Sequence, residues 1–399
     1  MSVAGPQIDV FQPTGPDDVE AFHRILVECF GFPPPGEYDL ADREGLENLR
    51  LVRRNGKLAG GLSVPITGQF WGGRSVPMGA VRAVGVAPEH RAKGVGGMLM
   101  RAVLQDLYDR GVPLSALYPA TLPVYRHAGY EQAGSWTQYR LPTRQIDVRD
   151  RGLEAVRLDP TSLDMGAFND LYGDLARTSA GMLDRSDWFW RNRFFTGPKR
   201  TPAYVFGVRG EHDGLQGYVS FSHRPVARGY ELMVHDLVAS TPAAMRRLWS
   251  LLADHRSLAP AVEWVGPPGE PLLLGLAEME AEVARRLHWM LRLVDVEAAL
   301  EARGYAQGLT AELHLDVHDE VMPVNHGHWL MQVANGIATV TKGGRGDLKI
   351  HVRGLAALYT GFMTPTGLAI AGLLEGPENA KSAAAAIFAG PAPWMVDFF

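Results

Sequence analysis

Apolar residues recur at helix and strand spacings in the first third of the chain. Residues 17–30, DDVEAFHRILVECF, place apolar side chains at helical spacing behind an acidic first turn, which predicts a helix. Residues 49–70 alternate on both sides of Asn55-Gly56, a pair that favours a tight hairpin turn. A strand at 81–86, a glycine-rich turn, a helix from Met98 and a strand in VPLSALYP (112–119) follow. This order predicts a domain of mixed α and β structure.

Residues 205–255 repeat this plan with one difference. VFGVRGEHDGLQGYVSFSH (205–223) parallels the hairpin, with Asp213-Gly214 near its turn, and 231–255 parallel the strand, turn and helix. The first half carries RAKGVGG at 91–97, whereas residues 243–249 contain no glycine. A turn that is lost while its scaffold is kept indicates that the turn serves a ligand rather than the fold.

The last hundred residues change pattern. Alternating stretches at 311–321 and 328–343, a strand that runs into a helix at 347–362 and a helical stretch at 378–390 predict a small α+β module. His314, Asp316 and His318 alternate along one strand and therefore share a face. Such a row could hold a metal, but solvated strand faces are far commoner, so we expect no metal site.

Composition limits the function classes. With 399 residues, 46% of them hydrophobic, the chain is long enough for two or three domains. A net charge of −5 argues against nucleic acid or an anionic membrane as the main partner. No apolar run could span a bilayer, the first residues lack the pattern of a signal peptide, and Cys29 is the single cysteine. We therefore expect a cytoplasmic protein, although secretion is not excluded.

The glycine-rich turn has the position of an anion site. A helix N-terminus exposes unpaired backbone N–H groups, and glycines let a phosphate approach them closely. The pattern Arg91-x-x-Gly94-x-Gly96 follows directly on the strand that ends Val84-Gly85-Val86, and it matches neither the dinucleotide nor the nucleotide glycine motif. It resembles the acetyl-CoA pyrophosphate loop of the GNAT acetyltransferases.

The three-part plan as a whole resembles the Eis group of GNAT acetyltransferases. Local marks are SALYPATLPVYRHAGYE (115–131) and LRLVDVEAALEARGY (291–305), and the resemblance covers essentially the whole chain. It implies a GNAT domain at 1–142, a degenerate second GNAT domain at 143–295 and a sterol-carrier-protein-like module at 296–399. It also implies a homohexamer.

The resemblance assigns roles to individual residues. Tyr125, in the context Y-x-x-x-G-Y, would donate a proton to the CoA thiolate, with Tyr130 as its rival. The C-terminal carboxylate of Phe399 would accept the proton of the attacking amine, although Asp397 could take that part or the apolar tail could simply pack. If Phe399 is the base, Asp397→Asn should be tolerated. The implied acetyl-CoA contacts are Val84, Gly85, Val86, Arg91, Ala92, Lys93, Gly94, Val95, Gly96, Gly97, Ala120 and Thr121.

These observations predict an acetyl-CoA-dependent N-acetyltransferase that acts by direct attack in a ternary complex. Acidic residues at 37–44, with Glu28, favour a small cationic acceptor. By resemblance, an aminoglycoside, a polyamine or a lysine side chain would fit. The alternative is a non-catalytic protein that binds acyl-CoA or lipid, against which the intact glycine turn and Tyr125 both weigh.

Overall fold

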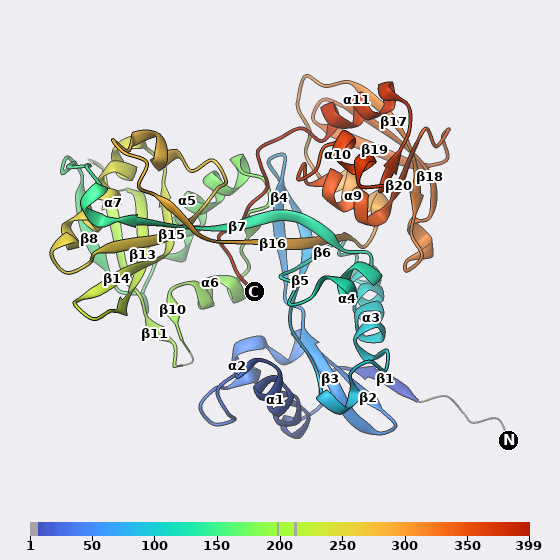
Figure 1. Cartoon of the computed structure of the whole chain (residues 1–399), viewed down its shortest axis with the longest axis horizontal. Helices are drawn as coiled ribbons and strands as arrows, with labels where there is room; N and C mark the ends of the chain where they lie inside the picture. Colours follow the sequence, from blue (N-terminus) through green and yellow to red (C-terminus); the bar gives the residue numbers. More distant parts are fainter. Residues whose placement is uncertain (1–6, 198, 211–213) are drawn as a thin grey trace. The chain divides into compact units, whose positions relative to one another are not determined.

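The computed structural model of the chain describes residues 7–197, 199–210 and 214–399 and divides into two compact units (Figure 1). Unit 1 contains the described residues up to Ala133, His288–Gly390 and Phe399. Unit 2 contains Gly134–Leu287 and Pro391–Phe398. Each unit is therefore built from segments that are far apart in the sequence.

No helix in the described ranges is both long and apolar enough to cross a membrane.

The N-terminal part of unit 1 has the predicted mixture of strands and helices. Its elements are β1 (Ile8–Phe11), α1 (Pro16–Phe30), α2 (Leu40–Glu44), β2 (Leu49–Arg54), β3 (Lys57–Ser63), β4 (Ile66–Trp71), β5 (Arg74–Val86), α3 (Val95–Asp109), β6 (Leu114–Leu117) and α4 (Leu122–His127).

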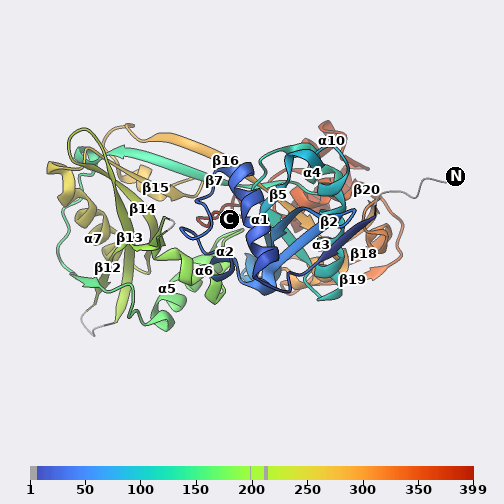
Figure 2. The same cartoon turned by 90° about the horizontal axis from the view of Figure 1, so that it is seen from below.

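Side chains of opposite strand faces explain where the first helices lie. On β2, Leu51 packs in a cluster with α1, whereas Val52 packs in a cluster with α3. Because successive strand residues point to opposite faces, α1 and α3 cover opposite faces of the sheet (Figures 1 and 2). The predicted helix and hairpin are confirmed, and Asn55 and Gly56 both have the positive φ angles that the tight turn requires.

Strands β5 and β6 pair in parallel over only part of β5. The ladder joins Met78 to Leu114 and ends where Val81 faces Leu117, although β5 continues to Val86. On its other side β5 pairs with β3 through a bulge, at which Ala83 takes a φ of 50°. The predicted strand at 81–86 is thus the end of a longer strand, and among the residues that the structure describes no strand pairs with this end on its β6 side.

The C-terminal part of unit 1 is a separate small module of mixed α and β structure, as predicted. A sheet in the order β19–β18–β17–β20–β21 carries helices α9, α10 and α11 (Figure 1). Its elements are α8 (Val296–Ala302), β17 (Ala311–His318), β18 (Gly327–Ala334), β19 (Ile337–Lys342), β20 (Leu348–His351), α9 (Val352–Tyr359), α10 (Pro365–Ile370), β21 (Leu374–Glu375) and α11 (Glu378–Ile387).

Unit 2 contains the predicted second copy of the strand–helix plan. In unit 2, a hairpin of β12 and β13 is followed by β14 and α7. In unit 1, the hairpin of β2 and β3 is likewise followed, after β4, by β5 and α3. Asp213, expected at the hairpin turn, lies outside the described residues. The elements are β8 (Glu154–Leu158), α5 (Met165–Thr178), β9 (Leu183–Asp184), α6 (Asp187–Arg193), β10 (Phe195–Thr196), β11 (Thr201–Pro202), β12 (Tyr204–Arg209), β13 (Leu215–Pro225), β14 (Tyr230–Ala239), α7 (Pro242–Ala253) and β15 (Ala261–Gly266).

Two long strands carry the chain from one unit to the other. These are β7 (Glu131–Pro142) and β16 (Glu282–Leu293). In unit 1, the end of β16 pairs with β6, from Met290 facing Leu117 to Leu293 facing Leu114. In unit 2, β7 pairs along β15. The sheet of each unit therefore contains a strand that leads into the other unit.

Candidate active site

The glycine-rich turn lies at the N-terminus of α3, as the sequence predicts. Gly94 is the N-cap residue, and no side chain caps the helix. The helix begins at Val95, so Gly96 and Gly97 belong to its first turn. The first amides of a helix have no partner within the helix, and they carry the positive end of its dipole. The turn therefore presents backbone donors suited to an anion such as a phosphate.

Packing within the protein does not explain all three glycines. Gly94 has a φ of 78°, a conformation that other residues rarely adopt. A Cβ atom at Gly97 would meet no described atom within 4 Å, and one at Gly96 would come no closer than 3.8 Å to Val124. The fold itself would thus accept a side chain at both positions. Their lack of a side chain fits a ligand that approaches the backbone.

The corresponding helix of unit 2 begins differently. Thr241 is the N-cap of α7, and its hydroxyl accepts a hydrogen bond from the Ala244 amide at 3.1 Å. A protein side chain therefore satisfies one of the first-turn donors in the second copy. This contrast supports the interpretation that the turn of α3 is kept for a ligand.

The end of β5 and the start of α3 lie next to each other in the chain. Val84 and Val86 are half-buried, and the backbone from 82 to 86 has no strand partner on the β6 side within the described residues. Arg91 and Lys93 are exposed, and each bonds a backbone carbonyl of this region: Arg91 Nε donates to Val86 at 3.1 Å, and Lys93 Nζ donates to Glu89 at 2.7 Å. Both cations thus lie close to the turn.

Tyr125 and Tyr130 have distinct surroundings. Tyr125, on α4, is 7% exposed, and its ring lies edge-on to that of Tyr130 at 6.3 Å. Within the described residues its hydroxyl has no hydrogen-bond partner, and burial raises its pKa to about 12. Tyr130 is fully buried, and its hydroxyl donates to Ser115 Oγ at 2.7 Å. Tyr125 is therefore the tyrosine whose proton is not already committed.

The last residue, Phe399, lies in unit 1 and is 8% exposed. Its ring packs edge-on against Tyr118 at 5.5 Å. Tyr118 directly follows β6, and the exposed residues Ala120 and Thr121 lead from it into α4. The chain end thus packs on the short segment that joins β6 to the helix of Tyr125.

Asp397, the alternative base, is ion-paired. It is 3% exposed, and Arg185 Nε donates to both of its carboxylate oxygens at 3.1 Å. Its carboxylate therefore already has a buried cationic partner. The expectation that Asp397→Asn is tolerated stays a prediction, but that change would remove one charge of a buried ion pair. The sequence contained the aspartate but no signal for its partner, which lies 212 residues away.

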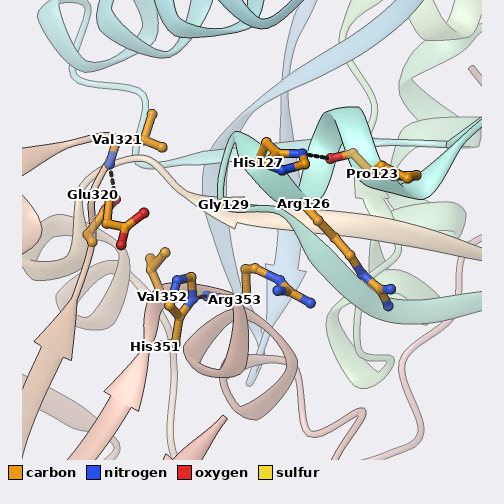
Figure 3. A pocket seen from close by; sticks show the side chains of 10 residues that line it. Pro123, Arg126, His127, Gly129, Glu320, Val321, His351, Val352 and Arg353 are labelled. Atoms are coloured by element: carbon orange, nitrogen blue, oxygen red, sulfur yellow. Dashed lines mark hydrogen bonds between the residues drawn. The ribbon is translucent and has the colours of Figure 1, made fainter. Parts of the chain in front are cut away.

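A cavity of about 380 Å³ in unit 1 is distinct from these residues (Figure 3). Its walls come from α4 and the residue Gly129 after it, the segment after β17, and the junction of β20 and α9, and it contains none of the predicted acetyl-CoA contacts. The lining residues are Pro123, Arg126, His127, Gly129, Asp319, Glu320, Val321, His351, Val352 and Arg353. In the described ranges, no group of three or more histidine, cysteine, aspartate or glutamate side chains could hold a metal ion.

Three parts of the chain match known families. Residues 11–133 and residues 181–293 each match an acetyltransferase (GNAT) domain, and residues 296–396 match a sterol carrier protein domain. The two acetyltransferase matches agree with the repeated strand–helix plan. The third match agrees with the separate C-terminal module.

Full-length relatives share this plan. A GCN5-related N-acetyltransferase from Anabaena variabilis is 37% identical, with a TM-score of 0.92 over 98% of this chain and 100% of that one. An uncharacterized N-acetyltransferase of Streptomyces griseus is 30% identical over 98% of this chain and 100% of its own length. Eis1 from Mycobacterium abscessus is 26% identical, with a TM-score of 0.78 over 98% and 100% of the two chains.

Proposed function

Because this chain belongs to the Eis-type GNAT N-acetyltransferases, we propose that it transfers the acetyl group of acetyl-CoA directly to an amine of a small cationic acceptor. The observation that carries the proposal is the packing of Phe399 against Tyr118. It gives the buried chain end a place on the segment that leads from β6 to Tyr125. Tyr125 as the acid and the carboxylate of Phe399 as the base would then lie close enough to act on the same acetyl transfer.

Acetyl-CoA fits the geometry of β5 and α3. The backbone of Val84 to Val86 offers amide and carbonyl groups to the pantetheine arm. The amides of residues 94–97 would hold the pyrophosphate, with Arg91 and Lys93 close enough to add positive charge. The absent Cβ atoms of Gly96 and Gly97 leave the backbone accessible to the phosphate oxygens.

The chemical step follows from two protein groups. The amine nitrogen attacks the thioester carbonyl, so a C–N bond forms and the C–S bond breaks. The carboxylate of Phe399 takes the proton that the amine loses, and Tyr125 gives its hydroxyl proton to the departing thiolate. Solvent then returns a proton to Tyr125 and removes one from Phe399. Tyr125 is neutral at pH 7, as any tyrosine with the ordinary pKa of 10.0 would be, and burial raises its pKa further, to about 12.

Of the acidic residues expected to attract a cationic acceptor, some have structural roles and others are exposed. Asp39 caps α2 by accepting from the Asp42 amide, and buried Glu44 pairs with Arg82. Glu28 and Glu37 are exposed acids near these residues. An aminoglycoside, a polyamine or a lysine side chain carries the complementary positive charge.

A transfer assay tests the proposal. The full chain is incubated with acetyl-CoA and, separately, neomycin, spermidine or Nα-acetyl-lysine, and released CoA is measured with a thiol reagent. We expect acceptor-dependent CoA release, an acetylated product by mass spectrometry and intersecting initial-rate plots, as a ternary complex requires. Parallel plots, or CoA release without acceptor, would contradict direct attack. Tight acetyl-CoA binding by calorimetry with no turnover on any amine would favour the non-catalytic alternative.

A further inference from the structure

The residues before Phe399 are fixed to unit 2 by their backbone. The Ser135 amide donates to the Pro393 carbonyl at 3.0 Å, and the Met395 amide donates to the Ser135 carbonyl at 3.3 Å. The Trp394 amide donates to Ala180 at 2.9 Å. The tail thus pairs with β7 through a single parallel bridge between Trp394 and Ser135, and Met395 is fully buried.

Beyond this bridge, Asp397 of the tail belongs to a buried charge cluster. Arg185 is completely buried and contacts two carboxylates: Nε bonds Asp397 at 3.1 Å, and Nη1 bonds Asp236 at 2.6 Å. Its guanidinium carbon lies 3.8 Å from the centre of the Tyr172 ring. Arg193 adds a second cation, 3.8 Å from Asp397. Two arginines therefore balance two aspartates, and one of these aspartates belongs to the tail.

A buried ion pair adds little net free energy to folding, because both charges lose their hydration. Its main effect here would be to favour one position of the tail over others. An apolar side chain at 397 would bury as well but would tolerate a shift along the tail. Nη1 and Nη2 of Arg185 donate to Asp236, which fixes the guanidinium plane, and Nε then donates to both oxygens of Asp397 from one defined direction. Since two residues of chain span at most about 7 Å, fixing Asp397 limits how far the carboxylate of Phe399 can move.

We propose that the Arg185–Asp397 pair is a latch that positions the C-terminal carboxylate for catalysis. Both are positioning residues in this proposal, because they bond each other and would act only through the carboxylate of Phe399. The inference rests on the proposed function, in which that carboxylate is the base. The latch would also give the second GNAT domain a role. The first turn of its helix α7 is capped by Thr241, and the domain would bind the C-terminal tail rather than acetyl-CoA.

The test uses Asp397→Asn in the full chain, because Arg185 remains paired with Asp236 and unit 2 should fold. Carboxypeptidase A should release Phe399 at least about tenfold faster than from the wild type, since it attacks the undocked tail. On the best acceptor of the amine panel, kcat per acetyl-CoA site, counted by calorimetry, should fall at least about tenfold through lost positioning. The Kd for acetyl-CoA should stay within about twofold, since the latch does not contact it.

Glu263→Gln is the matched control. Glu263 is another buried carboxylate of unit 2, paired with Arg224 and accepting from Gln138 at 2.7 Å, and it does not contact the tail. It should lower thermal stability but leave both tail release and kcat per site unchanged. Should Asp397→Asn fail to fold, Arg185→Lys keeps a cation between the two aspartates while losing the fork, and it should release Phe399 at an intermediate rate.

Two results would overturn the latch. Tail release at the wild-type rate in Asp397→Asn and Arg185→Lys would show that the pair does not hold the tail, while the proposed base would stand. Faster release with unchanged kcat would show that the position of the tail is irrelevant to turnover. That second result would also remove Phe399 from the proposed mechanism.

Discussion

Tyr125 and Tyr130 show what single residues reveal in sequence and what they conceal. The context Y-x-x-x-G-Y placed both tyrosines near the chemistry and favoured the first. What separates them physically is a hydrogen bond to Ser115, fifteen residues before Tyr130, and a ring buried to 0% exposure. Such partners depend on how β6 packs against the segment after α4. The sequence alone could not assign the free hydroxyl.

Tyr125→Phe should lower kcat by roughly 10²-fold or more, because it removes the acid and keeps the ring. The Kd for acetyl-CoA should barely change. Tyr130→Phe is the control: it deprives Ser115 of a donor, should cost about 1 kcal/mol of unfolding free energy and should leave kcat unchanged. Steady-state kinetics and denaturant unfolding measure both. A wild-type kcat in Tyr125→Phe would make it a packing residue.

The raised pKa of Tyr125 predicts the basic side of the pH profile. Burial favours the neutral phenol, so the proton donor stays loaded until pH approaches about 12, well above the ordinary value of 10.0. We therefore expect no loss of kcat from this group between pH 7 and about pH 10. A profile of kcat against pH at saturating substrates checks this, with Tyr125→Phe as the reference. A decline near pH 9 that Tyr125→Phe abolishes would contradict the assignment.

At the scale of elements, hydrophobic periodicity and turn residues predicted most of the first domain. The helix at 17–30, the hairpin around Asn55 and the helix after the glycine turn all appear in the structure. The full length of β5 could not be predicted from the sequence. Its first half is defined by pairing with β4 and β6 rather than by its own hydrophobic pattern. The bulge at Ala83 is likewise a property of the β3–β5 register.

Gly96→Val tests the turn as an element. A Cβ atom there meets no described atom closer than 3.8 Å, so its first carbon does not clash with the fold, but the side chain would stand between the phosphate and the amides. Acetyl-CoA affinity should fall at least about tenfold, measured by calorimetry on folded protein. Ala243→Val, at the same position of α7, should leave that affinity unchanged, whereas the neighbouring Ala244 is fully buried and a poorer control. Unchanged affinity in Gly96→Val would remove the basis for the cofactor site.

At the scale of the whole molecule, the sequence predicted three parts but not how segments combine. The boundaries at 142 and 295 remain predictions, and the compact units join residues up to 133 with 288–390. Long-range contacts create this pairing. Glu131, next to α4, bonds both Arg126 and Arg353, which is 222 residues away in the C-terminal module. Nothing in local periodicity signals such a partner.

Glu131→Gln should weaken the contact between the first domain and the C-terminal module. Burial alone would raise the pKa of Glu131, but hydrogen bonds from Arg126 and Arg353 hold it below its ordinary value of 4.5. Its stabilisation is therefore complete above that value and is lost as pH falls through the lower folded-state pKa. At pH 7 the variant should lose about 2 kcal/mol of unfolding free energy. Thermal melts should show the difference shrinking below pH 4.5; a difference independent of pH would contradict it.

The most direct test of the central claim changes only the last chemical group. Two semisynthetic proteins would end in Phe399 with a carboxylate or with a carboxamide, which has nearly the same size but cannot take the proton of the amine. We predict that kcat falls at least about 10²-fold in the carboxamide, with acetyl-CoA affinity and thermal stability unchanged. A carboxamide protein that acetylates its acceptor at the full rate would contradict the assignment of the chain terminus as the catalytic base.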